Sequence, residues 1–173
     1  MEAVDLIAQM MEIAAITAPK TKGENFVLIK TLKKDQLEQL AQGMIAFGER
    51  KQKNNFDRDA DNVLKSESIV LIGYKDAQPA KLDCGACGYP TCNDLKSAKV
   101  ENGEFRGPTC AYRLLDMGIA LGSAVKMASL FNVDNRIMYR IGAVARDIGL
   151  VDWDFVIGIP LSISGKNIYF DRL

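Results

Sequence analysis

The feature that most constrains this chain is the grouping of its cysteines in one short segment that is rich in glycine and proline. The 173-residue sequence holds four cysteines, at Cys84, Cys87, Cys92 and Cys110. Residues 77–110 show no sustained hydrophobic period, so they are predicted to form an irregular loop rather than a helix or strand. The regular part of the fold must therefore be built from the sequence on either side of this loop.

Periodic apolar patterns on both sides of the loop predict helices and strands. Helices are expected at 3–17, 35–51, 111–131 and 134–148, strands at 25–31, 68–75 and 153–159, and a polar surface segment at 51–66. A chain of this length suits a single domain. We therefore expect one α+β domain over residues 1–173, with helices packed on a small mixed sheet and residues 77–110 inserted as a cysteine-rich segment that binds a cluster.

The balance of positive and negative residues disfavours some classes of binding partner. Lys and Arg together number 22 and are matched by 22 Asp and Glu, so no excess charge favours nucleic acid or an anionic membrane. Acidic Glu2 and Asp5 stand where a secretion signal would carry basic residues. The apolar stretch 111–131 contains charges that would be costly in a bilayer. We expect a cytoplasmic protein with no nucleic-acid partner and no membrane insertion.

The absence of histidine from the sequence removes several kinds of site. Histidine-ligated zinc, Ser-His-Asp triads and Cys-His nucleophile pairs cannot be built within this chain. Any metal site must use thiolates or carboxylates. The sequence also presents no convincing catalytic acid or base, so it leaves open whether the protein is an enzyme.

The cysteine spacing is suited to an iron–sulfur cluster. The string CGACGYPTC at 84–92 offers three thiolates from one tight loop, and Cys110 offers a fourth from the start of the next helix. Gly85 and Gly88 permit backbone conformations in which N–H groups approach sulfide closely. We predict one [4Fe–4S] cluster on Cys84, Cys87, Cys92 and Cys110, and a function in electron transfer or redox chemistry.

Two other uses of the thiols remain open. Four thiolates also suit structural zinc, although zinc sites usually carry two C-x2-C pairs, and here a C-x4-C step replaces the second. Disulfides are the weaker alternative, because a cytoplasmic chain with a hydrophobic core neither needs nor easily keeps them. The non-redox reading is therefore a structural protein that binds zinc.

The cysteine motif carries a resemblance to known proteins. CGACGYPTC followed by a distal Cys110 resembles the [4Fe–4S] motif C-G-x-C-G-x-x-x-C…C of membrane electron-transport complex B subunits and corrinoid iron–sulfur proteins. Over its whole length the chain is similar to a family of uncharacterised ferredoxin-domain proteins common in anaerobic bacteria and archaea. This resemblance implies the cluster and a redox partner protein, and it is silent about substrate.

A second resemblance concerns the layout of the whole chain. The segments 18–25 and 157–161, with the long glycine-containing helix between them, resemble the arrangement of flavin-dependent nitroreductases. That family implies an FMN held between the two subunits of a homodimer, with its phosphate bound by basic residues near both ends of the chain. The matching candidates here are Lys20, Lys22, Lys166 and Arg172. The alternative function is thus a nitroreductase-like flavin reductase with an added cluster.

Overall fold

The centre of the molecule is a four-stranded antiparallel sheet. The computed structural model describes residues 2–170, and its sheet has the order β1 (Val27–Leu32), β2 (Ser68–Tyr74), β6 (Phe155–Ser162), β5 (Asp134–Asn135). The register places Val70 opposite Thr31 on one side and Ile159 on the other. Every pairing in this sheet is antiparallel, so its strands are not mixed in direction.

Strand β2 lies in the middle of the sheet and is buried along its whole length. All seven residues of its sequence SIVLIGY are buried. A strand with both faces covered has no solvent face to mark with polar residues, and it therefore reads as a continuous apolar run. Two layers of helices provide this cover.

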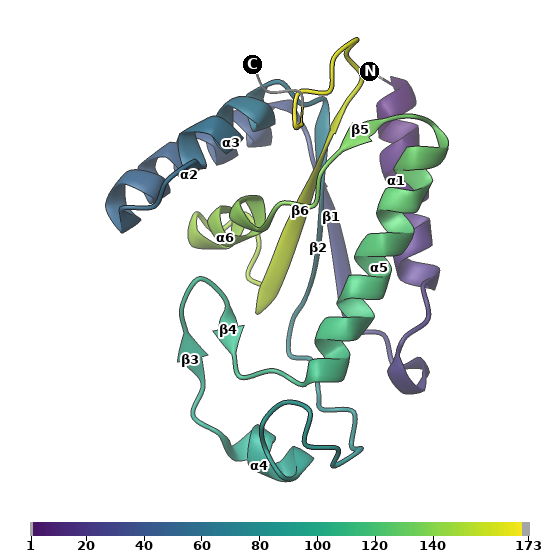
Figure 1. The fold of residues 1–173 in the computed structure, drawn as a ribbon, viewed down its shortest axis with the longest axis vertical. Helices are drawn as coiled ribbons and strands as arrows, with labels where there is room; N and C mark the ends of the chain where they lie inside the picture. The colour runs from purple at the N-terminus through teal and green to yellow at the C-terminus, as the bar shows by residue number, and fades with distance from the viewer. Residues whose placement is uncertain (1, 171–173) are drawn as a thin grey trace.

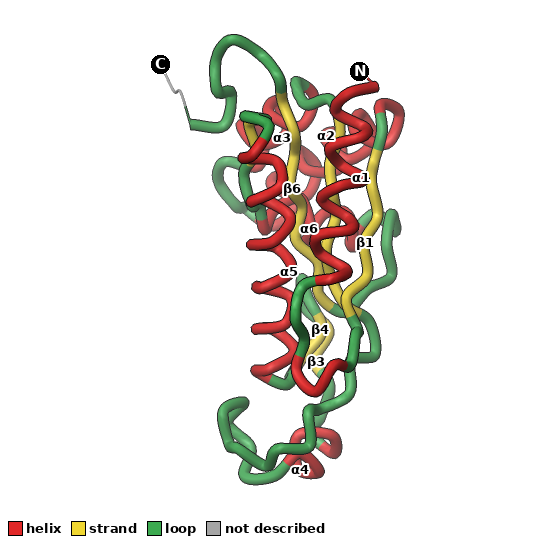
Figure 2. The backbone as a smooth tube through the Cα atoms, turned by 90° about the vertical axis from the view of Figure 1, so that its right-hand side faces the viewer, coloured by secondary structure: helices red, strands yellow, loops and turns green. Residues whose placement is uncertain are grey.

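The helices divide between the two faces of the sheet. Helices α1 (Glu2–Thr17) and α5 (Ala111–Leu130) pack side by side on one face (Figure 1). The other face is covered by α2 (Lys34–Lys51), α3 (Phe56–Leu64) and α6 (Tyr139–Asp147). Figure 2, turned by 90°, shows the strands side by side behind α1 and α5. Two separate apolar cores result, one on each side of the sheet.

Two glycines allow α6 to lie directly on β6. A Cβ at Gly142 would stand 1.8 Å from the carbonyl oxygen of Val156, and one at Gly158 would stand 2.0 Å from Cγ2 of Ile141. Neither contact is compatible with a side chain, because real Cβ atoms do not approach other atoms so closely. The close packing of this helix on the strand therefore depends on glycine at both positions.

The structure confirms the α+β class and most of the predicted elements. It differs in three places. Part of the segment 51–66, predicted as polar surface chain, forms α3, and Asp134–Asn135 form β5 before α6 begins at Tyr139. The cysteine-rich segment contains α4 (Cys92–Ser97) and a hairpin of β3 (Glu101–Asn102) and β4 (Arg106–Gly107). Across residues 2–170, no helix has both the length and the apolar character needed to span a bilayer.

Candidate metal centre

The cysteine-rich segment forms its own unit at one end of the sheet. It connects the end of β2 to the start of α5 and projects below both helix layers (Figure 1). Its buried residues Ala80, Leu95 and Cys110 form a third apolar cluster, against which Cys87 and two tyrosines pack. The segment therefore contributes little to the two main cores and has a small core of its own.

All four cysteines line one cavity within this segment. The cavity is small and is bordered by Cys84, Cys87, Cys92 and Cys110. All four are free thiols, and they range from exposed Cys84 to buried Cys110. Within residues 2–170, no three Cys, Asp or Glu side chains gather closely enough to hold a single metal ion. The four thiols thus line the same cavity without converging on one position.

Glycines shape the loop between the first two cysteines. Gly85 and Gly88 have φ angles of 72° and 86°, in the left-handed region that side chains disfavour. The Gly88 N–H donates to the Gly85 carbonyl oxygen at 2.9 Å and closes a tight turn around Cys87. As the sequence predicts, these two positions need glycine, and the reason is their backbone conformation.

The backbone around Cys92 is held from both sides. Its N–H donates to Oδ1 of Asp83 at 2.7 Å. Thr91 caps α4, because its hydroxyl oxygen accepts from the Asp94 N–H at 3.1 Å while the Asp94 carboxylate accepts from the Thr91 N–H at 3.0 Å. These bonds fix the backbone position from which the Cys92 side chain extends.

Cys110 lies at the N-cap of the 20-residue helix α5. Its carbonyl oxygen accepts from the N–H groups of Arg113 at 3.0 Å and Leu114 at 3.3 Å, so its backbone position is set by the helix. The N–H groups that begin a helix lack partners within it and carry partial positive charge. No acidic residue occupies the first turn to offset this charge. The Cys110 side chain therefore starts beside the positive end of α5.

Arg113 anchors the base of the cysteine-rich segment. Its side chain is only 1% exposed, and its Nε donates to the Gln78 carbonyl oxygen at 2.8 Å. Nη1 donates to the Thr21 carbonyl oxygen and to Oδ2 of Asp116, both at 3.2 Å, while Nη2 pairs with the Glu24 carboxylate. One guanidinium thus joins α5 to the chain after α1 and to the chain leading into the cysteines.

Asp116 completes this buried network. Its side chain is 5% exposed. Oδ1 accepts two hydrogen bonds from Thr21, one from the backbone N–H and one from the hydroxyl, each at 2.7 Å. Both oxygens of the carboxylate therefore have hydrogen-bond partners. These bonds connect the chain after α1 to the first turns of α5. Cys110 lies one turn before Arg113 on the same helix, so the network also supports the position of this cysteine.

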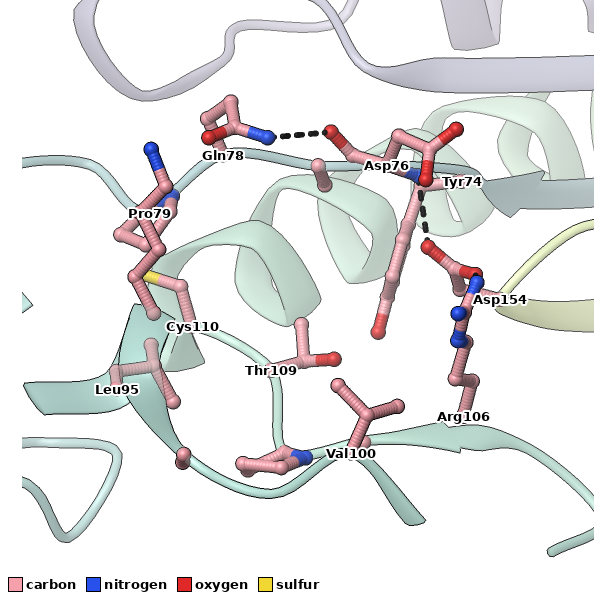
Figure 3. Close-up of a pocket in the computed structure, with 15 residues that line it drawn as sticks. Tyr74, Asp76, Gln78, Pro79, Leu95, Val100, Arg106, Thr109, Cys110 and Asp154 are labelled. Carbon is pink, nitrogen blue, oxygen red and sulfur yellow. Dashed lines mark hydrogen bonds and ion pairs between the residues drawn. The ribbon is translucent and has the colours of Figure 1, made fainter. Parts of the chain in front are cut away.

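A second cavity lies beside the thiols, and Tyr74 points into it from the end of β2 (Figure 3). The Tyr74 side chain is buried, and its hydroxyl has no hydrogen-bond partner among the described residues. The Thr109 hydroxyl lies close enough to temper the pKa of Tyr74 but does not meet hydrogen-bond geometry. Burial raises that pKa to about 12. The phenol therefore stays protonated at neutral pH.

The two buried tyrosines differ in a way that stability measurements can detect. The Tyr169 hydroxyl bonds to the Ser66 hydroxyl at 2.8 Å, whereas the Tyr74 hydroxyl is unpaired. We expect Tyr169→Phe to lower the free energy of unfolding by about 1 kcal/mol, and Tyr74→Phe to leave it unchanged or raise it slightly. Urea unfolding of both variants measures this. An equal loss in the two would show that the Tyr74 hydroxyl is paired.

Three of the basic residues proposed for a flavin phosphate lie in the described part of the chain, and these three are not gathered in one place. Lys20 donates through Nζ to carbonyl oxygens at the end of α1, at 2.6 Å from Ala15 and from Ile16, and burial lowers its pKa. Lys22 donates to the Lys81 carbonyl oxygen at 3.2 Å, so it lies against the cysteine-rich segment. Lys166 follows β6, at the opposite end of the sheet (Figure 1). Arg172 lies outside the described residues.

Two family models match successive parts of the chain. Residues 80–104 match a model described as "Putative Fe-S cluster", which includes three of the cysteines. Residues 106–172 match the model "Uncharacterized protein containing a ferredoxin domain", which includes the fourth. A protein of Archaeoglobus fulgidus is 44% identical over 171 residues, spanning 99% of this chain and 92% of its own length. These matches support an iron–sulfur protein.

Solved structures of nitroreductases share the fold. A Desulfitobacterium hafniense nitroreductase with bound FMN aligns with a TM-score of 0.60 at 12% identity, over 94% of this chain and 79% of its own. An FMN-dependent nitroreductase of Mycobacterium smegmatis in complex with NADPH aligns with a TM-score of 0.61 at 10% identity, over 97% and 82%. At such low identity, the likeness establishes a nitroreductase-like fold and nothing about the cofactor of this chain.

Proposed function

The chain belongs to the family of uncharacterised proteins that contain a ferredoxin domain, and on this premise we propose that it carries one [4Fe–4S] cluster and works in electron transfer or redox chemistry. The ligands in this proposal are Cys84, Cys87, Cys92 and Cys110. The observation that carries it is the single cavity lined by all four thiols.

The donor set and its surroundings fit such a cluster. Four thiolates are the usual ligands of a cubane, which when bound supplies a one-electron redox centre. All four thiols line one cavity, which brings together the four cysteine ligands that a cubane needs. The positive end of α5 would face the negative charge of a cluster bound at Cys110. Zinc on the same thiols is the outcome that the test below must distinguish.

Other residues of the site would set the reduction potential of the cluster and its access to a redox partner. The Gly88 N–H is taken by the Gly85 carbonyl oxygen, whereas the left-handed backbone at Gly85 would let its N–H approach sulfur without side-chain obstruction. Hydrogen bonds to sulfur raise a cluster's reduction potential. Cys84 is exposed while Cys110 is buried. A redox partner protein would therefore approach from the Cys84 side.

Metal and cofactor analysis of protein purified without oxygen tests the proposal. We expect about four iron and four acid-labile sulfide per chain, with a broad visible absorption that bleaches on reduction. Zinc bound without sulfide would replace the redox function with a structural one. The same sample reports flavin, so one preparation also decides the second candidate.

The second candidate is a nitroreductase-like reductase in which the cluster feeds an FMN. The shared fold favours it, because the two aligned nitroreductases bind or depend on FMN. The outer faces of α1 and α5 also expose large apolar side chains, including Leu6, Ile13, Leu115 and Ile119, which a second copy would cover in a homodimer. Stoichiometric FMN in a dimer would support this candidate, and flavin-free protein would leave the simple carrier.

A further inference from the structure

The β3–β4 hairpin lies in the chain between the third and the fourth cysteine. Only residues 98–100 separate it from α4, which begins at Cys92, and only Pro108 and Thr109 separate it from Cys110. Figure 1 shows the hairpin below α6, between that helix and α4. Because a short connection has a short reach, the place of the hairpin limits where Cys92 can lie relative to Cys110.

Arg146, in the last turn of α6, holds the turn of this hairpin. Its Nη1 donates to the carbonyl oxygens of Gly103 and Glu104, each at 3.2 Å, and its Nη2 donates to Oδ1 of Asn102. Its Nε donates to the Trp153 carbonyl oxygen at 2.8 Å, in the chain that leads into β6. One guanidinium group therefore connects the hairpin both to α6 and to the central sheet.

Two further contacts hold the same hairpin on the main body of the molecule. The ring of Phe105 packs against the core on the α6 side of the sheet, and its centroid lies 4.2 Å from that of Phe155. The Arg106 N–H donates to the Asp154 carbonyl oxygen at 2.8 Å. An apolar contact, a backbone hydrogen bond and the guanidinium group from α6 thus all act on residues 102–106.

The fourth cysteine and the first three are held by different parts of the molecule. Cys110 lies at the N-cap of α5 and moves with that helix. Cys84, Cys87 and Cys92 lie on the loop between the Gln78 carbonyl oxygen, which α5 binds, and the hairpin. A cubane needs all four sulfurs at fixed separations. The attachment of the hairpin therefore helps to decide whether the loop presents its thiols at the correct distance from the helix.

We propose that Arg146 is a positioning residue for the cluster, and that it sets the place of Cys92 relative to Cys110 by fixing the hairpin. This inference rests on the proposed function, because it concerns how the ligands of that cluster are placed. Arg146 acts through the hairpin, since its hydrogen bonds go to residues 102–104 and to Trp153. Without these bonds the loop gains freedom, and its thiols hold a cluster less firmly.

The rate of cluster loss from anaerobically purified protein tests the proposal. Bleaching of the visible absorption in excess chelator measures this rate. We expect Arg146→Met to lose the cluster about tenfold faster than the unaltered protein, because loss of outer contacts typically lowers metal affinity by about 10–100-fold. The electron paramagnetic resonance spectrum of the reduced cluster should also shift, since it reports the geometry of the ligands.

Two other variants separate the shape of the guanidinium group from its charge. Arg146→Lys keeps the positive charge but lacks the planar fork of donors, so it should resemble Arg146→Met. Asn102→Ala is an exposed change that removes only the acceptor of Nη2. It should speed cluster loss in the same direction by a smaller factor, and it keeps the test valid if Arg146→Met folds poorly.

Tyr169→Phe is the matched control for a general loss of stability. It removes the hydrogen bond to the Ser66 hydroxyl, which lies before β2, at the end of the sheet away from the hairpin. This variant should lower the free energy of unfolding without changing the rate of cluster loss or the resonance spectrum. Urea unfolding of every variant provides the comparison.

Three outcomes would overturn the positioning role. These are an unaltered rate and spectrum in Arg146→Met, full recovery of both in Arg146→Lys, and a change in Tyr169→Phe as large as that in Arg146→Met. Unaltered protein that contains neither iron nor sulfide would instead overturn the proposed function, and this inference with it. The metal content of the unaltered protein therefore distinguishes the two failures.

Discussion

A Cys87→Ser variant is expected to lose the iron–sulfur cluster while keeping the fold. The substitution removes one of four thiolates from the cavity that all four cysteines line. Loss of an outer hydrogen-bond partner alone typically lowers metal affinity 10–100-fold, so loss of a ligand should lower it by more than about 100-fold. Iron and sulfide analysis, with the visible spectrum of anaerobically purified protein, measures the result.

The fold should survive this change because the thiols lie outside the two main cores. Cys87 packs only against the small third cluster of the cysteine-rich segment. Asn93→Ser, an exposed change beside Cys92, is the matched control and should retain full iron and sulfide. Undiminished iron in Cys87→Ser would remove Cys87 from the ligand set, and far-ultraviolet circular dichroism would show whether the helices remain.

Replacing Arg113 with methionine is expected to cause the largest loss of stability of any single change considered. Methionine occupies much of the same volume but leaves the Asp116 carboxylate, 5% exposed, without its buried cation. Breaking a buried ion pair in this way typically costs about 3–5 kcal/mol. The Gln78 and Thr21 carbonyl oxygens also lose donors. Urea unfolding should show this loss, and the iron content should fall because the base of the cysteine-rich segment is released.

Arg50→Met provides the comparison for an exposed ion pair. Arg50 binds both carboxylate oxygens of Asp147, at 2.7 and 2.8 Å, but its side chain is 56% exposed. Such pairs contribute about 0–1 kcal/mol. A similar small cost for Arg113→Met would mean that water reaches the Arg113 network, and the anchoring role would then be rejected.

The fold was largely predictable where local pattern and burial agree. Strand β2 and helices α1, α2 and α5 follow directly from apolar periodicity. Helix α3 was missed because its sequence FDRDADNVL is dominated by polar residues. Its buried Asp59 is satisfied by Arg58 and Arg140, at 2.6 and 2.7 Å, and such pairing across the fold cannot be seen in a local window. The helix signal was present in Phe56, Ala60 and Val63, which share one face.

The prediction at residues 134–148 was wrong at its start because of a tertiary contact. The predicted helix includes Asp134 and Asn135, but these residues pair with Ser162 and Leu161 of β6. The helix begins only at Tyr139, after Met138 bridges to Gly158. A short strand that exists only through its partner strand has no local signature of its own.

The candidate site was predictable only for residues that carry an unusual side chain. The sequence alone indicates a metal centre, because four cysteines lie in one glycine-rich segment. Tyr74 reads as an ordinary strand residue, and its significance comes from a missing hydrogen bond. Arg113 and Asp116 did leave a signal, since opposite charges three residues apart in an apolar helix suggest an internal pair. That signal does not reveal the other partners of the pair, which come from distant segments.

The path of the chain between β2 and α5 has a consequence for how the protein would respond to damage. A cluster held by all four cysteines would act as a cross-link that divides this connection into closed loops. The longest loop runs from Cys92 to Cys110 and contains α4 and the β3–β4 hairpin. Cross-links restrain long loops most strongly. Oxidative loss of the cluster would therefore loosen α4 and the β3–β4 hairpin first and leave the sheet intact, so damage by oxygen would stay confined to this end of the molecule.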